Sequence, residues 1–307
     1  MNISIVIPTY NRNKILCETL TSVLKETEQC NFKTEIILVD QSLEHDIETT
    51  KFLNSIKNNE NLIIINPEIP SLPLARNIGI NAAQYDIILF LDDDVILQPN
   101  FFTNLSNSFK EPKINSVVGR IQIVNSSKDN ILLKNNYNIK NKIKNILIKL
   151  LGNGKNAIIT NQGLILCNLT STSSQIVDMG MGCCMAFRKK LFDKIGYFDC
   201  NYKGNALREE TDLFFRIKVN NDLVLYNPKV FLHHIMSNTG GCRNEKNEIY
   251  WQTYFYNQCY FYIKNFKYNK LRIFLLLLFD FIDSPIFKFK SFNIGYYKAL
   301  LILNNKQ

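Results

Sequence analysis

The chain has 307 residues, of which 46% are hydrophobic and 21% are charged, with a formal net charge of +9. This length and hydrophobic content exclude a disordered chain or a small disulfide scaffold, and they allow one large α/β domain with an appended region. The basic balance favours a polyanionic partner, either nucleic acid, a phosphorylated substrate or an anionic membrane surface, without choosing among them.

None of the eight cysteines forms a CxxC pair, which argues against a zinc ribbon and favours reduced thiols in a cytosol. The first apolar run, residues 3–7, ends at Pro8 with no small-residue cleavage site behind it, so we predict a strand and not a signal peptide. Residues 271–282 are too few to span a bilayer and include Asp280. We therefore expect a cytoplasmic protein without a transmembrane helix.

The first third of the chain alternates short apolar runs with segments of helical spacing. The apolar runs, typical of strands buried on both faces, are residues 3–7, 36–39, 62–65 and 87–91. Between them, apolar residues recur every three or four positions, as in Leu16, Leu20, Val23 and Leu24. This alternation predicts a mostly parallel, doubly wound sheet flanked by helices.

Sheets of this kind bind ligands just beyond the carboxyl ends of their strands. In this chain those ends carry polar and acidic residues, at positions 8–12, 40–42 and 92–94. The sequence therefore predicts a functional site at this edge of the sheet.

Asp92, Asp93 and Asp94 directly follow the fourth predicted strand. Adjacent carboxylates repel and raise one another's pKa unless a cation lies among them. Mg²⁺ and Mn²⁺ take oxygen ligands from carboxylates and from substrate phosphate. We predict that this cluster holds a metal and a diphosphate; the alternative is an exposed acidic turn that caps the next helix, near Asn100.

Residues 128–155 differ in character from the rest, with seven lysines and one acid. Apolar residues at helical spacing between Ile139 and Leu151 predict a basic amphipathic helix. This helix either packs on the body with a solvated lysine face or lies on a membrane surface and presents the active site to a lipid-linked acceptor.

The last third carries a second acidic cluster, an aromatic-rich end and two adjacent histidines, His233 and His234. The cluster comprises Glu209, Glu210 and Asp212, and acids also favour the first turn of a helix. From residue 249 on, aromatic residues are frequent, and we predict that most of them form a core with C-terminal helices.

Several ordered motifs together make the chain resemble a family 2 glycosyltransferase of the GT-A fold. They lie at residues 6–12, 37–42, 74–79, 90–95, 188–199 and 208–213, followed by His234 with Gly240 and Gly241. The resemblance implies a GT-A domain over residues 1–245, with 128–155 as a basic amphipathic insertion. An aromatic-rich helical region would then cover residues 246–307.

The resemblance also implies a nucleotide-sugar site. The residues that would wall the base are Pro8, Thr9, Tyr10, Asn11 and Arg12. Asp40 would accept a hydrogen bond from a uracil or thymine N–H, although Gln41 stands where the family often has a further acid. Arg76 would reach the nucleotide or its diphosphate, and Asp92 with Asp93 would contact the donor.

The same resemblance implies the metal ligands and the catalytic base. Asp94 would ligate Mg²⁺ or Mn²⁺ directly, with His234, six residues before Gly240, as the second protein ligand and His233 as the fallback. Glu210 stands at the position of the base, where the family more often has Asp. Glu209 and Asp212 remain alternatives for that role.

The expected activity is inverting transfer from a nucleotide diphosphate sugar, UDP or dTDP by way of Asp40, to a glycan or lipid-linked acceptor in surface polysaccharide synthesis. We expect no nucleic-acid partner and a peripheral contact with the inner face of the membrane. The alternatives are a sugar-phosphate nucleotidyltransferase, which would need a glycine-rich basic loop after the first strand, and a non-catalytic nucleic-acid-binding protein, which leaves both acidic clusters without a role.

Overall fold

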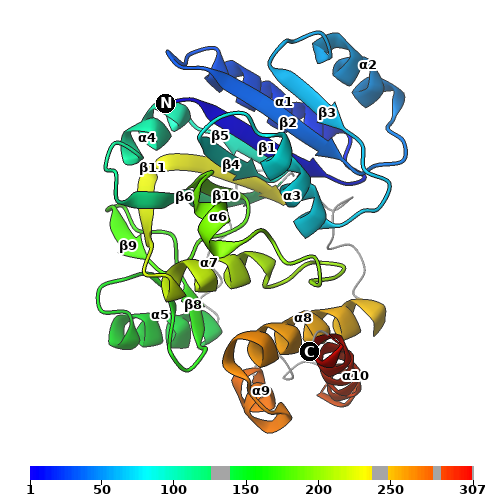
Figure 1. The fold of residues 1–307 in the computed structure, drawn as a ribbon, viewed down its shortest axis with the longest axis vertical. Helices are drawn as coiled ribbons and strands as arrows, with labels where there is room; N and C mark the ends of the chain where they lie inside the picture. Colours follow the sequence, from blue (N-terminus) through cyan, green and yellow to red (C-terminus); the bar gives the residue numbers. More distant parts are fainter. Residues whose placement is uncertain (126–138, 237–247, 279–284, 306–307) are drawn as a thin grey trace.

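The computed structural model describes residues 1–125, 139–236, 248–278 and 285–305 (Figure 1). A nine-stranded sheet forms its centre, in the order β3-β2-β1-β4-β10-β6-β11-β5, and β9 pairs with β11. Gly240 and Gly241 of the motif that follows His234, and residues 128–138 of the basic segment, lie outside the described residues.

The first half of the sheet has the predicted parallel arrangement. Its strands are β1 (Ile3–Thr9), β2 (Thr34–Asp40), β3 (Leu62–Ile65) and β4 (Ile87–Leu91). These four strands pair with one another in parallel, with β1 between β2 and β4. The helices between them are α1 (Lys14–Thr27), α2 (Ile47–Ile56) and α3 (Leu72–Ala82). The alternating pattern therefore predicted this half correctly.

The second half of the sheet is mixed. Its strands are β5 (Val95–Leu97), β6 (Ile114–Asn125), β9 (Gln175–Val177), β10 (Cys184–Arg188) and β11 (Leu223–Met236). β10 runs antiparallel to β4 and β6, whereas β11 runs parallel to β6 and antiparallel to β5 and β9. The mostly parallel sheet that we expected is thus parallel on one side and mixed on the other.

Each face of the sheet is covered by a helical layer. Leu16 and Leu20 of α1 share one apolar core with Phe102 of α4 (Phe101–Ser108). On the other face, Ile80 of α3 and Phe214 of α7 (Glu209–Val219) share a second core. Within each strand, successive side chains enter opposite cores, because strand residues alternate between faces. The site residues at the strand ends are thereby held on a rigid support.

Two smaller units complete the sheet domain. The helix predicted over residues 139–151 is present as α5 (Ile139–Leu151), and it lies against a hairpin of β7 (Ala157–Ile159) and β8 (Ile165–Cys167). Ile148 of α5 is buried with Ile158 and Leu166. The short helix α6 (Leu191–Ile195) follows β10.

The C-terminal region consists of α8 (Glu248–Phe266), α9 (Lys270–Leu276) and α10 (Pro285–Asn304), which lie together at one end of the molecule (Figure 1). Its aromatic residues form a third core, which also includes Tyr202 and Ala206 of the sheet domain. Lys264 of α8 joins this region to the sheet domain, since its ammonium lies 2.8 Å from Asp199 and 2.9 Å from Asp212. Within the described part of the chain, no helix combines the length and the apolarity needed to cross a membrane.

Candidate active site and metal centre

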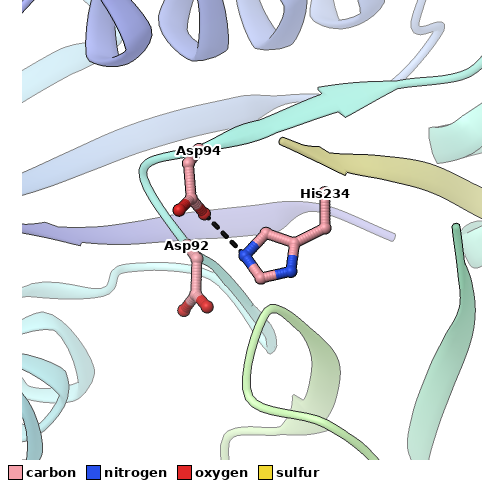
Figure 2. A group of neighbouring side chains, drawn as sticks. All are labelled: Asp92, Asp94 and His234. Atoms are coloured by element: carbon pink, nitrogen blue, oxygen red, sulfur yellow. Dashed lines mark ion pairs between the residues drawn. The ribbon is translucent and has the colours of Figure 1, made fainter. Parts of the chain in front are cut away.

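Strand pairing brings together the predicted metal ligands, which are far apart in the sequence. Asp92 and Asp94 lie between β4 and β5, and β5 pairs with β11 so that Val95 stands opposite His234. The backbone N–H of Ile235 donates to the carbonyl of Asp94 at 2.8 Å. Because of this register, one ligand atom from each of Asp92, Asp94 and His234 lies within 4.8 Å of the others (Figure 2).

This group fits a divalent cation. Two carboxylates and one imidazole are ligands that Mn²⁺ accepts, and Mg²⁺ prefers the oxygens among them. Asp94 and His234 are buried, and Figure 2 shows them facing each other with Asp92 beside them. The exposed acidic turn that we weighed as an alternative is not what the structure has, because Asp93 and Asp94 are buried.

Arg12 supplies a positive charge to the same acids. Its Nη2 donates to Asp94 Oδ2 at 3.0 Å, and its Nε lies 3.3 Å from Asp93 Oδ1. Burial raises the pKa of Asp93 to about 7, and the nearby Arg12 counteracts this only in part. The carboxylates are therefore crowded enough to need cationic partners, as the sequence predicted. Arg12 is one partner that sequence reasoning assigned only to the base pocket.

A cleft with an empty volume of about 630 Å³ borders this group. Its lining residues are Pro8, Thr9, Tyr10, Arg12, Gln41, Leu72, Asp92, Asp93, Asp94, Asn205 and His234. Asn11 is not among them; its backbone has a φ of 52° and its N–H donates to Ser42 Oγ at 2.8 Å. Asn11 thus ties the loop after β1 to the loop after β2.

Both carboxylate oxygens of Asp40 already contact other groups of the protein. Its Oδ1 accepts from the backbone N–H of Ser42 at 3.0 Å, and its Oδ2 lies 2.7 Å from His45 Nε2. It is not among the residues that line the cleft, whereas its neighbour Gln41 is. His45, for which the sequence suggested no role, is thus the partner of the predicted base-binding acid.

A second cleft, with an empty volume of about 840 Å³, adjoins the first. It is lined by Leu72, Arg76, Asp92, Met181, Gly182, Cys183, Asn205, Ala206, Leu207, Glu209, Glu210, His234, Tyr250 and Tyr254. The two clefts share Leu72, Asp92, Asn205 and His234. They therefore form one composite site, with Asp92 and His234 of the candidate metal-binding group at the junction.

Arg76 joins the two acidic clusters. It is 2% exposed, its Nη2 lies 3.4 Å from Asp92 Oδ1, and its Nη1 pairs with Glu209. Its Nη2 also donates to the carbonyl of Gly182 at 3.3 Å. A Cβ at position 182 would lie 2.7 Å from Arg76 Nη2, so the glycine permits this close approach.

The three candidate bases have different surroundings, although all lie in the first turn of α7, as helix-terminus preferences predict. Glu209 is buried against Arg76. Glu210 is half-buried and lines the second cleft. Asp212 is fully buried and does not line either cleft. The groups that bond to Asp212 are Tyr202 Oη, Arg216 Nε, Asn265 Nδ2 and Lys264 Nζ, at 2.9–3.2 Å.

The adjacent histidines 233 and 234 also have different surroundings. His234 belongs to the candidate metal-binding group, whereas Nδ1 of His233 lies 3.4 Å from Gln98 Nε2 and its ring is 5.2 Å from that of Phe231. Burial lowers the pKa of His233. His234, and not the fallback His233, is therefore the histidine near Asp94.

Sequence reasoning missed several residues that line the composite site, among them Asn205 and the tyrosines 250 and 254. The tyrosines fall in an aromatic run that looks like core, and one chain in isolation does not reveal which face of that helix borders a cleft.

Structural comparison identifies the fold. The chain is similar in structure to GalNAc-T7 with UDP, GalNAc and Mn²⁺ (TM-score 0.59, 18% identity), covering 99% of this chain and 57% of that one. It is also similar to the mannosyltransferase PcManGT of Pyrobaculum calidifontis in complex with GDP-Man and Mn²⁺ (TM-score 0.55, 13% identity), covering 99% and 75%. These likenesses show the GT-A fold, a mixed sheet flanked by helices.

The family model described as "Glycosyl transferase family 2" matches residues 4–196. Because this match covers more than half of the chain, the protein belongs to glycosyl transferase family 2. The resemblance drawn from the sequence motifs is therefore confirmed, although the motifs at 208–213 and at His234 lie beyond the matched residues.

Curated relatives are glycosyltransferases too. The poly(ribitol-phosphate) β-N-acetylglucosaminyltransferase TarP of Staphylococcus aureus is 28% identical over 123 residues, 38% of this chain and 36% of TarP. The glycosyltransferase GlyG of Streptococcus pneumoniae is 29% identical over 117 residues, 38% of each chain. The S. aureus poly-β-1,6-N-acetyl-D-glucosamine synthase is 29% identical over 127 residues, 41% of this chain and 30% of the synthase. Each match thus spans less than two-fifths of the relative.

Proposed function

We propose that this protein is an inverting, metal-dependent glycosyltransferase that moves a sugar from a UDP- or dTDP-sugar to a hydroxyl of a glycan or lipid-linked acceptor in surface polysaccharide synthesis. One observation carries the proposal. A single composite cleft is lined by Asp92, Asp94 and His234, which together could hold a cation, and also by the carboxylate of Glu210.

In this proposal, Asp92, Asp94 and His234 hold Mg²⁺ or Mn²⁺. An ion held by these residues would supply positive charge against the donor diphosphate and against the charge that develops on it as the leaving group. Arg12 keeps Asp94 oriented through its 3.0 Å hydrogen bond. Arg76, fixed between Asp92 and Glu209, adds positive charge beside the same diphosphate.

Glu210 is the proposed general base. As the acceptor oxygen attacks the anomeric carbon, its proton passes to the Glu210 carboxylate and the bond from that carbon to the diphosphate oxygen breaks. Attack from the face opposite to the leaving group inverts the anomeric configuration. Glu209 is committed to Arg76 and Asp212 to four donors, so neither is as available as Glu210 to accept a proton.

The preference for a uracil or thymine base rests on Asp40. In the present arrangement its carboxylate is paired with His45 and Ser42, so one of these contacts must be exchanged for the base N–H. Gln41 lines the cleft, but its own amide is engaged: Oε1 accepts from the backbone N–H of Ser71 at 2.6 Å and Nε2 donates to the carbonyl of Thr9 at 3.4 Å.

The test is a panel of nucleotide sugars, with and without Mn²⁺, in which hydrolysis or binding of the donor is measured. We expect activity with a UDP- or dTDP-sugar and its loss without metal. A preference for GDP-sugars would overturn the assignment to Asp40. Metal-independent turnover would overturn the role of the Asp92, Asp94 and His234 group.

We also propose that α5 contacts an anionic membrane from the cytoplasmic side. Of the side chains that the structure describes in α5, residues 145–151, Ile148 is buried, whereas Ile146 (56%), Leu150 (73%) and Leu151 (51%) are exposed. The segment that includes α5 is rich in lysine. Apolar side chains beside a basic surface are typical of helices that lie in the membrane interface.

Sedimentation with vesicles distinguishes this contact from a solvated helix. Vesicles rich in phosphatidylglycerol should retain the protein, and pure phosphatidylcholine should not. A variant with both Leu150→Ser and Leu151→Ser should lose retention. Retention that is equal on both kinds of vesicle, or unchanged in the variant, would contradict the proposal.

A further inference from the structure

One wall of the second cleft comes from the C-terminal helices. Tyr250 and Tyr254 of α8 line this cleft together with Glu210. The family match ends at residue 196, so family membership does not account for this wall. Two aromatic side chains and the proposed base therefore line the same cleft.

These two tyrosines differ from the others on α8. Tyr256 and Tyr260 are buried, and their hydroxyls donate to Asn201 O and Asp199 Oδ2, both at 2.8 Å, which makes them part of the core. Tyr250 and Tyr254 are only half-buried. Their ring centroids lie 6.4 Å apart with a tilt of 30° between the ring planes. They thus offer two neighbouring aromatic rings at the cleft.

Tyr254 is fixed in position relative to the acids of α7. Gln258 Nε2 donates to Tyr254 Oη at 3.1 Å, and Gln258 Oε1 accepts from Arg208 Nε at 2.8 Å. Arg208 is the N-cap residue of α7 and directly precedes Glu209 and Glu210. The aromatic wall and the proposed base are therefore coupled by two hydrogen bonds.

We infer that Tyr250 and Tyr254 form the acceptor subsite and stack against a pyranose ring whose hydroxyl faces Glu210. This inference rests on the proposed function. A pyranose has a face of C–H groups that packs on an aromatic ring, while its hydroxyls need polar partners such as the Tyr hydroxyls and Asn205. Leu72 and Met181 line the same cleft and add apolar surface. An acyclic polyol lacks a rigid C–H face, so the subsite selects sugars with a ring.

A binding experiment without donor tests the subsite directly. Saturation-transfer NMR would use methyl β-D-glucopyranoside and methyl N-acetyl-β-D-glucosaminide as probes, with ribitol as the acyclic control. We expect transfer to the ring C–H protons of at least one pyranoside and none to ribitol. Tyr250→Leu and Tyr254→Leu should lose the signal, whereas Tyr254→Phe, which keeps the ring, should retain it.

The matched control is Tyr85→Leu. Tyr85 is also half-buried, but it precedes β4 at the end of the strand opposite to Asp92, and the variant should keep the pyranoside signal. Equal signals from ribitol and the pyranosides, no signal from either pyranoside, or an undiminished signal in both Leu variants would overturn the inference.

Kinetics separates the subsite from a structural role and from the proposed function. With an active donor, the Leu variants should raise the KM for a pyranoside acceptor about 10-fold and leave UDP affinity unchanged. Equal loss of UDP affinity would mean that the tyrosines only support the fold. If no nucleotide sugar is turned over, the proposed function fails, and the NMR experiment still decides the subsite.

Discussion

Asp94 lies between His234 and Arg12, 2.8 Å from the imidazole and 3.0 Å from the guanidinium. Asp94→Asn keeps the size of the side chain and removes its charge, so Mn²⁺ affinity should fall at least about 100-fold. Titration calorimetry with MnCl₂ measures this. Asp86→Asn, an exposed acid just before β4, is the control and should bind Mn²⁺ as the unaltered protein does. Unchanged affinity in Asp94→Asn would remove Asp94 from the metal site.

The base is tested by comparing two neighbouring glutamates. Glu210→Gln should lower kcat by about 10²- to 10⁴-fold, because the amide cannot take the acceptor proton, and UDP affinity should not change. Glu209→Gln should instead weaken UDP binding, because Arg76 loses its partner. Steady-state kinetics and UDP titration distinguish the two variants. Full activity in Glu210→Gln together with loss of kcat in Glu209→Gln would move the base to Glu209.

Some of the individual residues of the candidate site could be predicted from the sequence. Asp92, Asp94 and His234 could be found because strand ends and motif spacing mark them. Asp212 is in the same acidic cluster, yet its carboxylate bonds to Lys264 and Asn265 of α8. Its direction depends on how a helix some fifty residues later packs against α7, which no local pattern encodes. The contact of Arg12 with Asp93 and Asp94 also depends on tertiary packing.

Among the elements, the junction of α8 with the sheet domain depends on Asp199. Burial alone would raise the pKa of Asp199, but the Lys264 ammonium at 2.8 Å and hydrogen bonds from Lys264 and Asn201 hold this pKa well below its usual range. A carboxyl with a lowered pKa in the folded state stabilises the fold above its unfolded pKa, and this contribution is lost as the pH falls.

Asp199→Asn should therefore lower the unfolding midpoint at about pH 7, and its deficit should shrink progressively below about pH 4. Urea unfolding of both proteins across this range measures the effect. Asp193→Asn on α6, an exposed acid, serves as the control. A deficit in Asp199→Asn that is the same at every pH would mean that packing, and not charge, causes it.

The elements themselves were predictable to different degrees. The strands β1 to β4 follow from apolar runs of four or five residues, and each was found within three residues of its bounds. The mixed half of the sheet did not follow from the sequence. β5 and β9 have three residues each, too short for a periodic signal, and the direction of β10 is fixed only by its pairing with β4 and β6.

For the molecule as a whole, we propose that the catalytic domain extends to about residue 245 and that 246–307 is an appended region which the domain nevertheless needs. Truncation at residue 245 would remove Lys264 from Asp212 and Asp199, and Tyr260 from Tyr202. The buried carboxylate of Asp212 would lose two donors, which is costly in a low-dielectric interior. The truncated protein should unfold at a lower temperature than the full chain, as calorimetry would measure. Equal melting temperatures would mean that the region is dispensable for folding.

The guanidinium of Arg12 affects how much thermal stability the protein loses when divalent ions are removed. Since it already offsets negative charge on Asp93 and Asp94, stripping divalent ions with EDTA leaves these acids with an internal counter-ion. Melting temperature should then change by no more than about 2 °C on chelation, while turnover stops and returns when Mn²⁺ is restored. In Arg12→Gln, by contrast, chelation should bring a clear loss of thermal stability. The metal-free protein would thus stay folded and would regain activity as soon as a divalent ion binds again.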